Sequence, residues 1–157
     1  MTDQLSMRER GRNLLEELRR MGLLNHGCAI SAEIVQSIAG IDVPEVGRKE
    51  DFQKPALDEL AVVDYVRNVL LAEGKYITAD RGGYRILLPS ENAGQVMRYM
   101  RSADSKLRRA IKLGKSTPPG DPAMNNNLVR AQAKRNGLKA KRDQAQLTGL
   151  RDNGGKH

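Results

Sequence analysis

Apolar residues recur at intervals of three and four along four segments of the chain, 7–21, 32–39, 57–71 and 90–113. This spacing places them on one face of a helix, so the sequence predicts four amphipathic helices. A serine precedes or opens three of the segments, where its side-chain oxygen can accept a backbone N–H as an N-cap. These predicted caps are Ser6, Ser31 and Ser90.

Between the third and fourth helices the pattern changes to that of a β-hairpin. Tyr76–Thr78 and Tyr84–Leu88 are rich in the β-branched and aromatic residues that favour strands. The four residues from Asp80 to Gly83, Asp-Arg-Gly-Gly, supply the positive φ angles that a tight turn needs. Gly74 follows the third helix and predicts a left-handed C-cap there.

The segment before the third helix is expected to be a long turn. Residues 41–55 are polar and are interrupted by Pro44, Gly47 and Pro55, which leaves room for at most one helical turn around residues 49–53. We therefore expect the third helix to begin near Leu57. Its inward face is predicted to carry Leu60, Val63, Val66 and Leu70.

The fourth helix carries a heptad of small and apolar residues, spaced 4, 3, 4 and 3. Two arrangements remain open: the heptad packs on its own domain, or it pairs with a second copy to make a homodimer. Its members are Val96, Met100, Ala103, Leu107 and Ala110.

A linker and a polar tail are predicted after Gly114. Residues 116–122 are rich in Pro, Ser and Thr, and residues 124–157 are rich in Asn, Gln, Lys and Arg without a continuous apolar face. A weak helix over Leu128–Ala145, broken at Gly137, is the most order we expect there. The predicted organisation is a domain over residues 1–88, a basic amphipathic helix over 89–115 and a flexible basic tail over 116–157.

The charge of the chain is concentrated in its C-terminal third. Residues 1–100 hold 13 Lys and Arg against 15 Asp and Glu, whereas residues 101–157 hold 14 Lys and Arg against four Asp. An asymmetry of this kind predicts a polyanionic partner that is bound through the basic extension.

The residues that usually carry catalysis or bind metals are sparse. The single Cys28 and the histidines His26 and His157 form no ligand cluster, and no phosphate-binding loop or nucleophile motif is present. No apolar run approaches the ~20 residues of a membrane span. We expect no enzyme, no metal or cofactor and no membrane partner, and a cytoplasmic location.

The order helix, short connection, helix, turn, helix and hairpin resembles the winged helix-turn-helix superfamily of DNA-binding proteins. The resemblance covers roughly residues 8–88 and depends on element order and on the hairpin sequence GKYITADRGGYRILL. It implies a mainly α fold with a small β-hairpin. It also implies a third helix that reads DNA through Asp64, Arg67 and Asn68, and a wing that contacts DNA through Arg81 and Arg85.

Acidic residues qualify this expectation, because Asp58 and Glu59 occupy the first turn of the predicted reading helix and would repel phosphates.

The favoured function is a small duplex DNA-binding protein that acts as a transcriptional or replication accessory factor. Two alternatives remain: a protein–protein adaptor or inhibitor with the tail as a nonspecific nucleic-acid anchor, and an RNA-binding or virion-type packaging protein that relies on the tail alone. The predicted nucleic-acid contacts are Arg48, Lys49, Lys54, Arg67, Asn68, Arg81, Arg85, Arg98, Arg101, Lys106, Arg108, Arg109, Lys112, Arg130, Lys134, Arg135, Lys139, Lys141 and Arg142.

Overall fold

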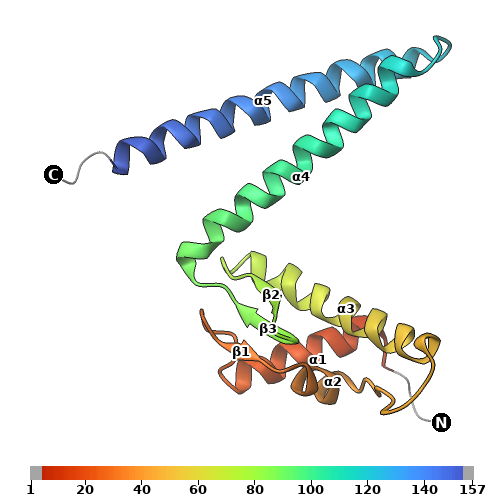
Figure 1. Ribbon diagram of the computed structural model, residues 1–157, viewed down its shortest axis with the longest axis vertical. Coiled ribbons are helices and arrows are strands. Elements are labelled where there is room, and N and C mark those ends of the chain that lie inside the picture. The colour runs from red at the N-terminus through yellow and green to blue at the C-terminus, as the bar shows by residue number, and fades with distance from the viewer. Residues whose placement is uncertain (1–4, 154–157) are drawn as a thin grey trace. The chain divides into compact units, whose positions relative to one another are not determined.

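The computed structural model describes residues 5–153, with side chains described through residue 144 and at residue 146. The chain divides into two units, residues 1–93 and 94–157, and the boundary falls inside a helix rather than at the predicted positions 88 and 115. Within the described residues there are five helices and three short strands (Figure 1). The mainly helical class with a small β component, predicted from the sequence, is confirmed.

Three helices and a small sheet make up the first unit. Its elements follow in the order α1 (Met7–Arg20), β1 (Ala29–Ile30), α2 (Ala32–Ala39), α3 (Lys49–Leu71), β2 (Ile77–Asp80) and β3 (Gly83–Ile86). The strands form one antiparallel sheet in the order β1-β3-β2. The first strand, β1, therefore pairs with the last, which brings the connection between α1 and α2 against the hairpin.

The first two helices begin at the serines that the sequence indicates. The Ser6 side chain accepts the N–H of Glu9 at 3.3 Å, and the Glu9 carboxylate accepts the N–H of Ser6 at 2.8 Å, which completes a capping box. The Ser31 side chain accepts the N–H of Ile34 at 3.2 Å. Gly40 then ends α2 in a left-handed conformation.

An aliphatic core joins α1, α2, α3 and the sheet. Its fully buried side chains come from all of these elements, and the absence of Trp leaves branched aliphatic residues to fill the space. The backbones of α1 and α3 approach closely where Gly11 faces the ring of Tyr65. The largest fully buried side chains are Leu14, Leu18, Ile30, Val35, Val62, Val63, Val66, Leu70, Ile77 and Ile86.

The third helix differs from the prediction at its N-terminus and on one face. It begins at Lys49, eight residues before Leu57, because the Asp51 carboxylate accepts the N–H of Arg48 at 2.7 Å and caps the chain there. Pro55 lies within the helix and removes only one backbone hydrogen-bond donor. Leu60, predicted in the core, is 53% exposed.

The hairpin turns at Arg81 and Gly82, which both adopt positive φ angles of 50° and 78°. Asp80 pairs with Gly83 across this two-residue turn. An added Cβ at Gly83 would lie 2.6 Å from the carbonyl oxygen of Ile30, so glycine is required for β1 to approach β3. Gly82 thus allows the tight turn, and Gly83 allows the close approach of β1 to β3.

The fourth helix, α4 (Pro89–Ser116), begins one residue before the predicted cap Ser90. Proline is favoured at the first helical position because the N–H it lacks would have no partner there. The Glu91 carboxylate accepts the N–H of Leu88 at 2.8 Å and supplies the cap in place of a serine.

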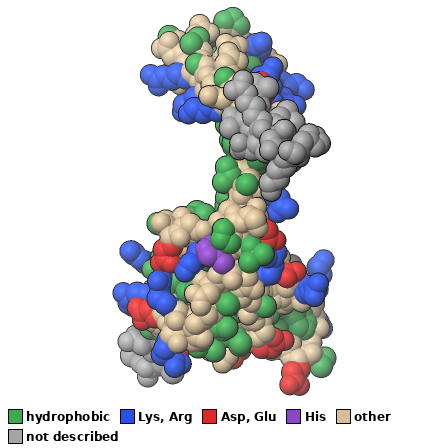
Figure 2. Space-filling view, turned by 90° about the vertical axis from the view of Figure 1, so that its left-hand side faces the viewer, with side chains coloured by type: hydrophobic (Ala, Val, Ile, Leu, Met, Phe, Trp, Pro, Cys, Tyr) green, Lys and Arg blue, Asp and Glu red, His purple; other side chains and the backbone are tan. Residues whose placement is uncertain are grey.

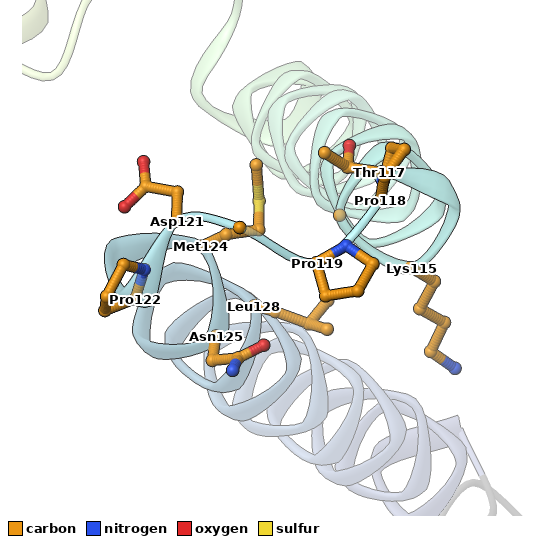
Figure 3. Close-up of a pocket in the computed structure, with 11 residues that line it drawn as sticks. Lys115, Thr117, Pro118, Pro119, Asp121, Pro122, Met124, Asn125 and Leu128 are labelled. Carbon is orange, nitrogen blue, oxygen red and sulfur yellow. The ribbon is translucent and has the colours of Figure 1, made fainter.

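The second unit is a helical hairpin formed by most of α4 and by α5 (Pro122–Asn153). The linker predicted at residues 116–122 is the turn between the two helices, and it borders an open hollow of about 630 Å³ (Figure 3). Met124 and Leu128 line this hollow from α5, and Gly114 lines it from α4. An added Cβ at Gly114 would lie 3.2 Å from a Leu128 methyl carbon. Gly114, predicted to end the helix, thus permits α5 to approach it.

The predicted flexible tail is helical in the structure. One helix continues through Gly137, where the sequence predicted a break, because a helical glycine costs only about 1 kcal/mol relative to alanine. Contacts with α4 near the turn favour this helix. The last four residues of the predicted tail lie outside the described part of the chain.

The predicted heptad is displaced by one residue at three of its five positions. Met100 and Leu107 are partly buried, but Val96, Ala103 and Ala110 are exposed. From Met97 onward, the partly or fully buried positions of α4 are instead Met97, Met100, Asp104, Leu107, Ile111 and Gly114. The predicted heptad did not include the charged Asp104, which lies buried at the centre of the observed seam.

Candidate nucleic-acid interface

Unpaired cations are concentrated on the helical hairpin. Residues 94–157 hold 15 Lys and Arg against four Asp, whereas residues 1–93 hold 12 Lys and Arg against 15 Asp and Glu. Figure 2 shows basic side chains around the part formed by α4 and α5, and basic, acidic and apolar side chains intermixed over the first unit. Ten cations of the hairpin are exposed and form no ion pair among the described side chains. They are Arg98, Arg101, Lys106, Arg109, Lys112, Lys115, Arg130, Lys134, Lys139 and Lys141.

On α4 the bases follow the heptad of the helix. Arg98, Arg101, Ser105, Arg108 and Lys112 are spaced 3, 4, 3 and 4, one position after the buried seam residues. This spacing places them along one flank of the helix beside the seam. A row of guanidinium and ammonium groups with this geometry can follow a line of phosphates.

A groove of about 310 Å³ lies on this flank. It is lined by Ser105, Arg108, Arg109 and Lys112. Three cations and a hydroxyl donor meet in this groove, and its lining contains no carboxylate. Phosphate oxygens accept hydrogen bonds from all of these groups, so the groove has the chemistry of a phosphate contact.

Asp104 holds the two helices together beneath the basic flank. Its carboxylate is 8% exposed and accepts hydrogen bonds from Arg108 at 3.1 Å and from Arg135 of α5 at 3.0 Å. The hydrogen bond from Arg108, and after it the one from Arg135, lowers the pKa of the Asp104 carboxyl below its ordinary value. Arg135, predicted to bind nucleic acid, is therefore engaged between the helices, and Arg142 lies 3.9 Å from Asp143.

In the first unit three of the seven predicted contacts, Lys54, Arg67 and Arg85, have side-chain partners. Lys54 forms an ion pair with Asp58 at 2.9 Å, and Arg48 caps α3 through its backbone, whereas its neighbour Lys49 is exposed. The acidic residues that appeared to oppose DNA are also engaged. Glu59 accepts hydrogen bonds from the Tyr84 hydroxyl at 2.5 Å and from Gln36 at 2.9 Å, so it joins α3 to β3 and α2.

The predicted reading residues of α3 are divided by the structure. Arg67 pairs with Asp64, donates to the carbonyl oxygen of Ile77 at 3.1 Å and stacks over the ring of Tyr76 at 5.5 Å. This arginine fixes the end of α3 to β2. Asn68 is exposed one residue later.

The wing arginines also differ from each other. Arg81, at the tip, is exposed, as predicted. Arg85, also predicted to face solvent, is instead held by ion pairs with Asp80 at 3.4 Å and with Glu91 at 2.6 Å. The prediction that both arginines face solvent is wrong for Arg85, because the carboxylate of the following helix neutralises it.

Sequence reasoning missed Ser105 and Lys115 as members of the basic flank. Ser105 lines the groove of α4, and Lys115 extends the row of bases to the end of α4. The signal that could have identified them is the heptad itself, if the seam had been read through Asp104 rather than Ala103.

Comparison of the chain with protein-family models, with curated proteins and with solved structures found no match. The described helices were also compared with the length and hydropathy that a membrane span requires, and none of them meets both.

Proposed function

We propose that this protein binds duplex DNA, with the α4–α5 hairpin as its main contact surface. The carrying observation is that ten exposed hairpin cations form no ion pair with described residues, whereas Lys54, Arg67 and Arg85 of the first unit are engaged in ion pairs. Neutralising phosphates with Lys and Arg supplies most of the affinity of a DNA-binding protein.

The element order of the first unit and its β1-β3-β2 sheet support the interpretation of residues 1–93 as a winged helix domain. In this proposal the exposed Arg81 at the wing tip and Asn68 add contacts, while Arg67 and Arg85 maintain the fold. In this proposal the protein acts as a cytoplasmic accessory factor in transcription or replication.

Duplex affinity of matched charge variants tests this proposal. Arg109→Gln/Lys112→Gln removes two unpaired cations of the α4 groove, and Arg8→Gln/Arg12→Gln removes two exposed cations of α1 as the control. If both groove cations contact phosphates, fluorescence anisotropy near 0.1 M salt should show affinity falling on the order of 10- to 60-fold for the first variant. The control should bind like the wild type. Equal affinity of both variants would refute the assignment.

A further inference from the structure

The outward face of α3 exposes apolar side chains that a reading helix would not be expected to carry. Leu57 is 66% exposed and Leu60 is 53% exposed, one helical turn apart. The exposed Ala61 follows Leu60 on the same face. Together they form an apolar patch on the helix that contains the engaged Arg67.

An acidic groove adjoins this patch. It measures about 430 Å³ and lies between the N-terminal half of α3 and the chain that leaves α2. Asp58 borders the groove and immediately follows Leu57 in α3, so the groove and the patch occupy adjacent sides of the helix. Four carboxylates and two cations line it: Asp42, Glu50, Asp51, Asp58, Arg10 and Lys54.

We propose that α3 is a docking surface for a basic amphipathic helix of another protein. The apolar side of that helix would cover Leu57 and Leu60, and a Lys or Arg at its edge would enter the groove beside Asp58. Charge complementarity selects this partner, because the groove is net acidic. The first unit of another copy of the chain would instead bring its own carboxylates against those of the groove. Helices of this kind commonly bind by laying an apolar face on an exposed apolar surface.

This inference goes beyond DNA binding and uses a different surface. The protein would attach to duplex DNA through α4 and α5 while α3 remains available to a protein partner. Substitutions in the patch should therefore leave duplex affinity unchanged, which makes failure of one proposal distinguishable from failure of the other.

The test uses the full chain labelled with nitrogen-15 and a synthetic helical peptide of leucine and lysine, about 18 residues or five turns long. A leucine–glutamate peptide of the same pattern is the charge control. We expect the lysine peptide to shift amide resonances of residues 41–61 and the glutamate peptide to shift none of them. In Leu57→Ser/Leu60→Ser the affinity should fall on the order of tenfold, because less apolar surface is buried.

Two further variants sharpen the test. Leu113→Ser changes a leucine of α4 that is 68% exposed and should retain wild-type peptide affinity. Asp42→Asn/Asp58→Asn should weaken binding and reduce its salt dependence. Equal binding of both peptides, no shift in α3, or unchanged affinity in the patch variant would overturn the proposal. So would concentration-dependent shifts of α3 without peptide, which would assign the face to a second copy of the chain.

Discussion

Arg85 of β3 donates two hydrogen bonds to Glu91 of α4, from Nη1 to Oε2 at 2.6 Å and from Nη2 to Oε1 at 3.0 Å. The same carboxylate accepts the N–H of Leu88 at 2.8 Å. Glu91 therefore caps α4 and joins the helix to the wing. An arginine that the sequence assigned to DNA is instead part of the joint between the sheet and the helix.

This joint predicts an acid-sensitive stability. Hydrogen bonds from Arg85 and then from Leu88 lower the pKa of Glu91 from 4.5 to about 2. Because the folded-state pKa is depressed, the stabilisation is present above pH 4.5 and is lost as the pH falls towards about 2. Glu91→Gln cannot ionise, so we expect lower stability near neutral pH and a smaller loss between pH 4.5 and about 2 than in the wild type.

Urea unfolding near neutral pH and at about pH 3 measures this difference. Glu33→Gln is the matched control, since Glu33 lies in the first turn of α2 and is exposed. It should retain the wild-type pH dependence. Identical pH dependence in Glu91→Gln and the wild type would show that the joint contributes nothing.

Two helical glycines should respond in opposite directions to alanine. An added Cβ at Gly11 would lie 2.6 Å from Cγ of Tyr65, whereas at Gly94 nothing lies within 4 Å. We expect Gly11→Ala to lower the free energy of unfolding by about 1–3 kcal/mol through overpacking, and Gly94→Ala to raise it by up to about 1 kcal/mol through helix propensity. Chemical unfolding compares them, and a stabilised Gly11→Ala would contradict the observed α1–α3 packing.

Much of the first unit could be predicted from local sequence signals, whereas the start of α3 was predicted wrongly because two local signals compete there. The caps at Ser6 and Ser31 and the turn at Arg81 and Gly82 are local, so the sequence contains their signals. The early start of α3 depends on Asp51 overcoming the effect expected of Pro55. Such competition between local signals is decided only in the folded chain.

The amino-acid composition predicted where the candidate site lies, but not which of its cations are engaged in ion pairs. Charge counts identified the basic C-terminal third, yet they could not distinguish the exposed Arg109 from Arg135, which is bound by Asp104 across 31 residues. The apolar heptad on α4 also misplaced the seam, because an aspartate occupies its centre. Ion pairs between distant residues leave no periodic signal in a single sequence.

The contact between Asp104 and Arg135 should control the order of α5. Asp104→Asn removes the charge that both Arg108 and Arg135 contact. We expect several-fold faster amide hydrogen exchange in α5 and unchanged exchange in α1 to α3, because local opening depends on local contacts. Asp143→Asn, which lies further along α5 than Arg135, is the control. Unchanged exchange in Asp104→Asn would show that α5 is held by its apolar contacts alone.

The salt dependence of duplex binding tests most directly the claim that unpaired hairpin cations neutralise DNA phosphates. Each phosphate contact contributes about 0.9 to the slope of log affinity against log salt, so Arg109→Gln/Lys112→Gln should flatten that slope by roughly 1.8. The α1 control Arg8→Gln/Arg12→Gln should keep the wild-type slope. A slope unchanged in the first variant, or equally flattened in both, would contradict the account.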